Sequence, residues 1–351
     1  MKRPMVQKLG VVLEPTKKSF EKEAVLNPAC YQEGENIHLF YRAIDGHFKS
    51  SIGYAKLRGP MNVVERWNKP IIEREFPYEK KGVEDPRIAK VGRTYYMTYV
   101  AHDGKNAVTA YAKSKDLVNF EKRGVISPKI AYADADKIFQ HPEFGGGRLK
   151  DAYSLFASYY RESAGEDVLI WHKDSILFPK KINGQFAMLN RILPDMQIVF
   201  FKSFSNLKKS FWENYISQLS KYVVLENKHW FETRNIGGGC TPIETPKGWL
   251  VIYHAVEELN KGRRYHAGAA LLHKKDPLRV VGKLHEPLFS PEESWEISGD
   301  VSNVVFPTGT AIFGDTLYIY YGAADTRIAV ASVNLPELLT ALTDSSLSHH
   351  G

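Results

Sequence analysis

Five repeats of one pair of segments constrain the fold of this sequence more than any other feature. The first segment of each pair is a short run of apolar and aromatic residues. The five runs are 37–43, 95–101, 185–191, 249–255 and 317–323. Each follows a glycine turn signal, at Gly34, Gly92, Gly184, Gly248 and Gly314. A glycine turn followed by such a run is typical of a β-strand that leaves a tight turn.

The second segment of each pair follows after a loop and also predicts a strand. These segments are 52–57, 107–112, 197–201, 267–272 and 328–333; the third is bulky and the others are rich in small residues. Self-similar units are the signature of a repeat architecture, and units of about four strands pack well around a central axis. We therefore predict an all-β fold, a single five-bladed β-propeller over residues 1–343. A β-sandwich is the alternative, but five similar units fit it badly.

The remaining segments predict helices and connections. The longer gap between the second and third pairs, residues 131–174, predicts a partly helical insertion over one face. Its Gly145–Gly147 tract lacks the strand–loop–helix context of a phosphate loop and predicts a flexible turn. Apolar residues at helical spacing predict a packing helix within residues 205–222. Residues 335–342 predict a short closing helix, and residues 344–351 a polar tail.

Composition excludes several classes of protein. The chain is 43% hydrophobic and 25% charged, which is typical of a globular protein. Its net charge of +7 is dispersed, without the basic block of a nucleic-acid arm. No run of 18 apolar residues predicts a membrane span, and residues 1–16 lack the apolar core of a secretory signal. Cys30 and Cys240 lie far apart, which predicts neither a disulfide framework nor a zinc site. We therefore expect a cytoplasmic protein.

One motif stands out as a candidate for catalysis. Glu84-Asp85-Pro86-Arg87 places two carboxylates, a proline and an arginine just before the second apolar run. Because it precedes proline, Asp85 is expected to be extended. Arg87 is a candidate for holding a substrate oxygen or for keeping one carboxylate ionised. The alternative is a solvated turn with a surface ion pair. Asp134-Ala135-Asp136 lacks the further ligands of a calcium loop, so we expect no metal.

Polar residues recur near the ends of the predicted strand runs. They are Arg42, Arg191, His254 and Asp325, together with Asp85 and Arg87 ahead of the second run. In a propeller these strand ends meet at the central channel, so the pattern predicts a polar site there. Paired carboxylates can cleave a glycosidic bond, and arginines can hold hydroxyls or an anion. A structural role for each group alone is the alternative. Five aromatic residues are candidates for stacking on a sugar or for the core: Tyr41, Tyr99, Trp230, Tyr253 and Tyr321.

A set of motifs distributed along the chain resembles a known family. They are Asn27-Pro28, Phe40-Tyr41-Arg42, Glu84-Asp85-Pro86-Arg87, 181–184 with 189–191, 236–239, 248–254, 303–307 and 320–326. In this order they resemble glycoside hydrolase family 130, the mannoside phosphorylases and related β-mannosidases. The resemblance implies a five-bladed propeller that cleaves β-mannosides with inversion, with β-1,2 linkages favoured. It implies an oligosaccharide substrate and no cofactor, with phosphate as co-substrate only in a phosphorylase. The oligomeric state, including a homo-oligomer, stays open.

The resemblance also implies roles for individual residues. Asp85 matches the general acid of the family, which acts through a substrate hydroxyl. Three residues match positions that bind the mannose being removed: Asn27, Arg42 and Asp325. Arg191 and His254 match two positions that hold phosphate in the phosphorylases.

Two departures from the family pattern favour hydrolysis. Phosphorylases usually carry a cation where this chain has Asn235, and an arginine in the strand that aligns with Val108. Each lost charged bond is worth roughly 1.5–3 kcal/mol, so two losses weaken phosphate binding by roughly a hundredfold or more. Arg234 or Lys105 could substitute from a nearby register.

We therefore predict an inverting β-mannosidase as the main interpretation. Asp85 is its general acid, and Glu232 or Glu257 activates water; for Glu257 an exposed charged loop is an equal alternative. The alternatives are a mannoside phosphorylase, which releases mannose 1-phosphate, and a non-catalytic sugar-binding propeller.

Overall fold

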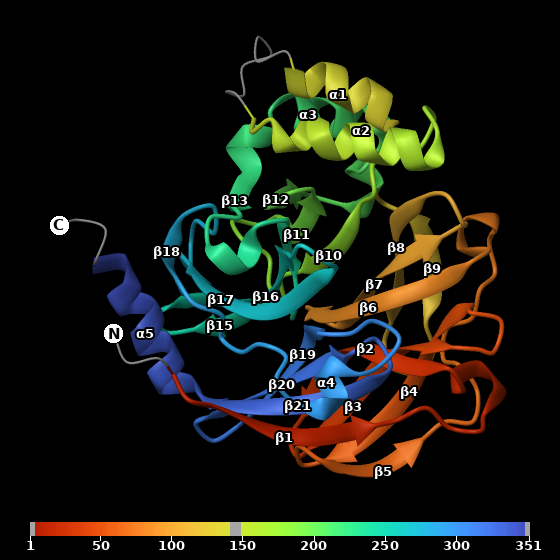
Figure 1. Ribbon diagram of the computed structural model, residues 1–351, viewed down its shortest axis with the longest axis vertical. Coiled ribbons are helices and arrows are strands. Elements are labelled where there is room, and N and C mark those ends of the chain that lie inside the picture. Colours follow the sequence, from red (N-terminus) through yellow and green to blue (C-terminus); the bar gives the residue numbers. More distant parts are fainter. Residues whose placement is uncertain (1–3, 141–148, 348–351) are drawn as a thin grey trace.

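A computed structural model of the protein describes residues 4–140 and 149–347, and most of its regular structure is β-strand (Figure 1). Hydrogen bonds join the strands into four sheets, one of which has eight strands. That sheet consists of two antiparallel groups joined through the single parallel pair Ser50 and Gly82. The strands therefore form five antiparallel groups in chain order.

Each group has an inner first strand followed by the predicted pair and an outer strand. The first group is β2 (Ala24–Glu33), β3 (Asn36–Ile44), β4 (Ser50–Arg58) and β5 (Asn62–Arg66). The second is β6 (Gly82–Val91), β7 (Thr94–His102), β8 (Ala107–Ser114) and β9 (Glu121–Val125). The third is β10 (Lys173–Leu177), β11 (Phe186–Ile192), β12 (Asp195–Phe201) and β13 (Val223–Leu225). The fourth is β14 (Asn235–Gly238), β15 (Ile243–Thr245), β16 (Gly248–Glu258), β17 (Arg263–Leu272) and β18 (Val280–Lys283). The fifth is β19 (Val305–Phe313), β20 (Thr316–Ala323), β21 (Arg327–Asn334) and β1 (Val6–Leu13).

All ten predicted strand segments are confirmed, and the members of each pair are antiparallel neighbours. β1 pairs with β21, so the N-terminal strand completes the last group (Figure 1). The mostly-β fold is thereby confirmed. Closure of the groups into a five-bladed propeller stays a prediction.

Four groups share a buried cluster of glutamate, tyrosine and a cation. The glutamates are fully buried: Glu21, Glu79, Glu232 and Glu296. Each accepts a hydrogen bond from a tyrosine of the second strand: Tyr41, Tyr99, Tyr253 and Tyr321. Each also pairs with a cation of the outer strand: Arg66, Lys122, Lys283 and Lys8. The cluster ties the segment ahead of each inner strand to the rest of its group. These four tyrosines therefore belong to the core rather than to a sugar platform.

The helices agree with the predicted insertion and closing segment. α1 (Tyr132–Gln140) and α2 (Ala152–Ala164) lie between the second and third groups, beside α3 (Lys209–Ser217) (Figure 1). The predicted turn at Gly145–Gly147 lies outside the described residues. α4 (Ser294–Ile297) is short. α5 (Leu335–Leu347) is the predicted closing helix; Leu338 and Leu342 are buried in the core, and the helix continues past residue 343. The helix therefore includes residues 344–347 of the predicted polar tail, and residues 348–351 lie outside the described part.

Two further observations bear on the expectations from composition. Both cysteines are free thiols. Within residues 4–140 and 149–347, the longest helices are too short and too polar to cross a bilayer.

Candidate active site

Three inner strands carry a bulge at the same place. The pairing register shifts between Leu26 and Ala29 in β2, between Glu84 and Arg87 in β6, and between Lys173 and Ile176 in β10. Inside these bulges lie three residues with left-handed backbones: Asn27 (φ 49°), Asp85 (φ 48°) and Asp174 (φ 55°). A bulge re-aims a side chain, and Asn and Asp tolerate this conformation better than most residues. The prediction that Asp85 is extended was wrong, because the bulge sets its backbone.

The first polar cluster contains the predicted acid and sugar-binding groups. Asn27 Nδ2 donates to Asp85 Oδ1 over 2.8 Å. Arg42 Nη1 lies 3.8 Å from the same oxygen, and Arg42 Nη2 lies 3.1 Å from Glu84 Oε1. Arg42 Nε donates to Ser50 Oγ, which fixes the guanidinium. The Asp85 side chain is only 10% exposed, so it does not form a solvated surface turn.

Asp325 belongs to the same cluster. It lies in the turn between β20 and β21 with φ 49°. Burial raises the pKa of Asp325 to about 6, and the nearby Arg42 guanidinium limits that rise. The Asp85 carboxylate also raises the pKa of Asp325, so the two carboxyl groups lie near each other.

A second cluster is centred on Asp174. Its carboxylate pairs with Arg191 Nη1 at 2.9 Å, and His254 Nε2 lies 3.9 Å from Asp174 Oδ2. Burial alone would raise the pKa of Asp174, but Arg191 and His254 lower it below the ordinary value. Burial lowers the pKa of His254 to about 4, so its ring is neutral near pH 7. The sequence analysis predicted Arg191 and His254 but missed Asp174.

Several buried polar atoms near these clusters lack a hydrogen-bond partner. They include Asn27 Oδ1, Asp174 Oδ2, Arg191 Nε, and both ring nitrogens of His254. His254 is fully buried and stacks on Phe306, with 4.2 Å between ring centroids. Because buried polar groups are nearly always bonded, atoms left over in one region indicate a place for a polar ligand.

Lys173 is a further cation that the sequence analysis did not single out. It pairs in register with Arg191 and lies over the Trp171 ring at 5.0 Å. Its charge lowers the pKa of both Asp174 and Asp325, so it lies near both clusters. The sequence around Lys173 gives little indication of a functional role, because its neighbour Asp174 is not part of a recognised motif.

Arg87 connects inner strands and is not free to bind substrate. Its side chain is 2% exposed, and Arg87 Nε donates to the Gly239 carbonyl at 2.5 Å. Arg87 Nη1 donates to the carbonyls of Asp85 and Pro86. A Cβ at Gly239 would lie 2.7 Å from the Pro307 carbonyl oxygen, so only glycine permits this approach. Arg87 therefore fixes the backbone of Asp85, which corrects its predicted role as a substrate-binding residue.

The two glutamates predicted to activate water have other surroundings. Glu232 belongs to the buried repeat cluster, where its carboxylate accepts from Tyr253, Lys283 and two backbone N–H groups. It has no capacity left for a water, so its role is structural. Glu257 is three residues from His254 on β16, so its side chain points to the opposite face of the strand. There it contacts His266 at 3.1 Å and Arg264 at 3.7 Å.

Arg234 and Lys105, the two residues considered as substitutes for the missing phosphate-binding cations, are both paired with carboxylates. Arg234 Nη1 donates to Glu258 at 2.7 Å, and Lys105 pairs with Asp167. Val108 lies in the core. These contacts leave Lys173 as a further cation near the clusters.

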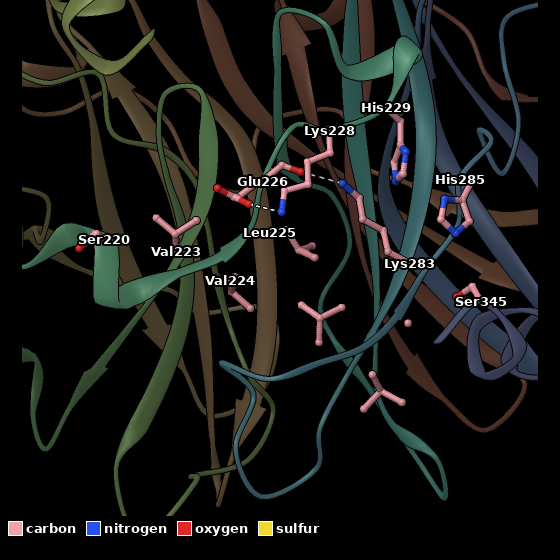
Figure 2. Close-up of a pocket in the computed structure, with 13 residues that line it drawn as sticks. Ser220, Val223, Val224, Leu225, Glu226, Lys228, His229, Lys283, His285 and Ser345 are labelled. Atoms are coloured by element: carbon pink, nitrogen blue, oxygen red, sulfur yellow. Dashed lines mark hydrogen bonds and ion pairs between the residues drawn. The ribbon is translucent and has the colours of Figure 1, made fainter. Parts of the chain in front are cut away.

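A cavity of about 510 Å³ lies away from both clusters (Figure 2). It is lined by β13, β18, α5 and the segment around Lys228. Its charged groups are paired, Lys228 with Glu226 and Lys283 with Glu232. Among the described residues, no group of three or more His, Cys, Asp or Glu could hold a metal ion. Asp134 and Asp136 instead pair with Lys137 and Arg161.

Comparison with known proteins gives a consistent result. A family model described as beta-1,4-mannooligosaccharide phosphorylase (Glyco_hydro_130) matches residues 2–344. A 1,2-beta-oligomannan phosphorylase of Thermoanaerobacter sp. (strain X514) is 32% identical over 338 residues, 93% of this chain and 96% of the relative. A beta-1,2-mannobiose phosphorylase of the same organism is 34% identical over 339 residues, 92% and 94% of the two chains.

Solved structures share the fold. A beta-1,2-mannobiose phosphorylase from Listeria innocua, in complex with beta-1,2-mannobiose, superposes with a TM-score of 0.70 at 22% identity and covers 96% of this chain and 99% of that one. A GH130 chain from a study of glycoside hydrolases that target beta-1,2 mannosidic linkages in Candida mannan has a TM-score of 0.69 at 22% identity, with 94% of each chain covered.

Proposed function

The chain belongs to glycoside hydrolase family 130, and we propose that it is a phosphorylase that cleaves β-1,2-linked mannosides with inorganic phosphate. One observation carries the proposal. The acid–sugar cluster around Asp85 lies beside a second cluster in which Arg191 Nε and both His254 nitrogens are buried without partners. The relatives named as phosphorylases favour this function, the earlier alternative, over the hydrolase that the sequence analysis favoured.

The proposed reaction uses each cluster for one task. Asn27, Arg42 and Asp325 hold the terminal mannose. Arg191, His254 and Lys173 hold phosphate on the opposite side of the anomeric carbon. A phosphate oxygen attacks this carbon as the glycosidic bond breaks, and protonated Asp85 delivers its proton through a substrate hydroxyl to the leaving oxygen. The products are mannose 1-phosphate, with inverted configuration, and a mannoside one sugar shorter. The attacking hydrogen phosphate carries one proton into mannose 1-phosphate, and release of that proton restores the protonated Asp85 for the next turnover.

The five strand groups support a five-bladed propeller as the scaffold of this site. β2 contacts both β6 and β19, and β10 contacts both β6 and β14. Adjacency of inner strands in this order is what a closed ring requires. We also propose a cytoplasmic location, since the sugar phosphate made by phosphorolysis is useful inside a cell.

A β-mannosidase remains the second candidate because of Asn235, which brings no charge to β14. Glu257 is its remaining water-activating candidate, at 17% side-chain exposure. Glu257→Gln should abolish turnover in a hydrolase and leave a phosphorylase active.

Replacing Arg191 with alanine should weaken phosphate binding. The loss of one charge-assisted donor is worth roughly 1.5–3 kcal/mol, which raises the KM for phosphate roughly 10- to 100-fold. The KM for the mannoside should change much less. Steady-state kinetics with each substrate varied in turn measures both constants. The matched control is Arg93→Ala, which removes an exposed arginine between β6 and β7. An unchanged KM for phosphate in Arg191→Ala would remove this residue from the proposed site.

The affinity for the sugar should fall in acid. Asp325, with its pKa raised to about 6, is ionised above that pH and takes up a proton below it. Protonation removes the negative charge beside Arg42 and weakens acceptance of a sugar hydroxyl. Calorimetric titration with β-1,2-mannobiose in phosphate-free buffer should show Kd rising as the pH falls through about 6. In Asp325→Asn, Kd should be raised at every pH and should lose this dependence. Persistence of the same transition in the variant would assign it to another group.

A further inference from the structure

A polar cavity of about 350 Å³ lies at one end of the first strand group. Three segments enclose it: the 3₁₀ helix Ser19–Glu21, the turn from β3 to β4, and the connection from β5 to β6. Its lining offers many hydrogen-bond donors, among them the side chains of Ser19, Lys49, Ser51, Asn68, Lys69 and Arg74. Ligand pockets in proteins occupy roughly 300–1,000 Å³, so this cavity is large enough for a small polar ligand.

Hydrogen bonds fix two walls of the cavity. The Ile52 N–H in β4 donates to the Ile72 carbonyl over 2.9 Å, which ties the connection from β5 to β6 to the start of β4. In the turn from β3 to β4, Asp45 Oδ1 accepts from the backbone N–H groups of His47 at 2.8 Å and Lys49 at 3.0 Å. The lining side chains therefore project from a fixed backbone, and the cavity is formed before a ligand binds.

The cavity carries more positive than negative charge. Among the residues that the structure describes, no carboxylate lies within ion-pairing distance of its three cations, Lys49, Lys69 and Arg74. Asp45 and Glu73 are the carboxylates in the lining. Burial alone would raise the pKa of Asp45, but its two hydrogen bonds within the turn and the charge of Arg74 lower it. The Glu73 residue is exposed to solvent. The three cations therefore lack a direct ionic partner within the described part of the chain.

Arg74 gives the most direct indication of a ligand. Its Nη1 atom is buried and has no hydrogen-bond acceptor among the described residues. Buried N–H groups are nearly always bonded, so this atom calls for an acceptor that the described residues do not supply. Guanidinium and ammonium groups bind phosphate oxygens through charge-assisted hydrogen bonds, and serine hydroxyls add neutral ones. The donors of the cavity therefore match an oxyanion better than a neutral ligand.

We propose that this cavity is a phosphate-binding site separate from the one at Arg191. Arg74, Lys49 and Lys69 bind the oxygens of a dianionic phosphate group, and the Ser51 hydroxyl donates to one of them. The group belongs to inorganic phosphate or to a sugar phosphate, which share this chemistry. The site is an addition to the proposed function and does not depend on which nucleophile the enzyme uses.

The position of the cavity separates it from the candidate phosphate site of the reaction. The first strand group and the segments that flank it form the cavity, whereas Arg191 and His254 belong to β11 and β16 of the third and fourth groups. Ser50 connects the cavity with the sugar-binding cluster, because it lines the cavity and its Oγ accepts from Arg42 Nε at 2.8 Å. A bound phosphate would therefore lie beside the residue that fixes Arg42.

The test counts phosphate sites by equilibrium dialysis with radiolabelled inorganic phosphate. The wild-type chain should bind two phosphates. Arg74→Ala should weaken one site roughly 10- to 100-fold, the effect of losing one charge-assisted donor, and Arg191→Ala should weaken the other. Because Lys69 is exposed, Lys69→Ala should fold like the wild type and weaken the same site as Arg74→Ala. The matched control is Lys80→Ala, which removes an exposed lysine of the same connection outside the cavity and should keep both sites.

The variants distinguish this site from the proposed function. Phosphate binding that stays unchanged in both Arg74→Ala and Lys69→Ala would overturn the proposal. A single wild-type site that only Arg191→Ala removes would overturn it too, yet leave the proposed function intact. Loss of a site in Arg74→Ala while Arg191→Ala changes nothing would support the cavity and contradict the phosphorylase.

Competition identifies the source of the phosphate group. In the Arg191→Ala variant, unlabelled inorganic phosphate and mannose 1-phosphate are compared as competitors for the remaining labelled site. Displacement by mannose 1-phosphate at the lower concentration would assign the cavity to a sugar phosphate, and the reverse order would assign it to inorganic phosphate. Label that neither competitor displaces would not be bound at a phosphate site, which would overturn the proposal.

Discussion

Asp85→Asn should lower kcat roughly 10²- to 10⁴-fold, the usual contribution of a general acid. Asparagine has nearly the same shape and can still meet Asn27, whose amide lies 2.8 Å from the carboxylate. It cannot deliver the proton to the leaving oxygen. The loss should therefore fall on kcat, with KM for the mannoside changing much less. Initial rates of mannose 1-phosphate formation across a range of mannobiose concentrations measure both.

A variant of Arg87 gives a second test of the role of Asp85. It fixes the Asp85 backbone through its carbonyl, and its Nη2 lies 3.9 Å from Asp174 Oδ1. Arg87→Lys should lower kcat through misplacement of Asp85, while the pH profile keeps its shape. The account is wrong about Asp85 if Asp85→Asn keeps more than about a tenth of the wild-type kcat, since a general acid typically contributes a hundredfold or more.

Glu232→Ala should destabilise the protein by about 3–5 kcal/mol, the cost of breaking a buried ion pair. The substitution leaves the Lys283 ammonium without its carboxylate, the Tyr253 hydroxyl without its acceptor, and two backbone N–H groups unpaired. Burial already lowers the pKa of Lys283, and Glu232 opposes that shift, so the lysine is poorly tolerated alone. Denaturant unfolding followed by tyrosine and tryptophan fluorescence gives the change in the free energy of unfolding.

The matched variant is Glu79→Ala, which breaks the equivalent cluster with Tyr99 and Lys122 in the second group. Both variants should lose stability alike, and their kcat per folded molecule should stay close to the wild-type value. A stable but inactive Glu232→Ala would contradict the structural role and restore Glu232 as the residue that activates water.

The sequence predicted the strands that have a clear local signal and missed those that do not. The ten confirmed segments are largely buried, and the first segment of each pair follows a glycine turn. The outer strands, such as Glu121–Val125, are charged and exposed, so their hydrophobic pattern is weak. Inner strands such as Lys173–Leu177 and Asn235–Gly238 contain bulges or glycines where strands approach closely, which removes the alternation expected of a strand.

The sequence likewise predicted some residues of the candidate site and missed others. Asn27, Arg42, Asp85 and Asp325 could be predicted because they occur in recognisable motifs, and the structure brings them together. Asp174 and Lys173 could not, since their role depends on contacts with Arg191 from another strand.

Arg87 and Glu232 were assigned to the site because the sequence alone does not reveal which charged side chains form hydrogen bonds or ion pairs within the fold. A signal for Glu232 was present in the spacing to its tyrosine. Glu21 and Glu79 precede their tyrosine partners by 20 residues, Glu232 by 21 and Glu296 by 25.

The position of a bound anion tests the central claim most directly. We would determine a crystal structure of Asp85→Asn with β-1,2-mannobiose and inorganic phosphate. The account predicts phosphate within hydrogen-bond distance of Arg191 Nε and the His254 ring, with the terminal mannose held by Asn27 and Asp325 between that anion and residue 85. A mannoside bound there with no anion beside Arg191, or with Glu257 holding a water at the anomeric carbon, would contradict it.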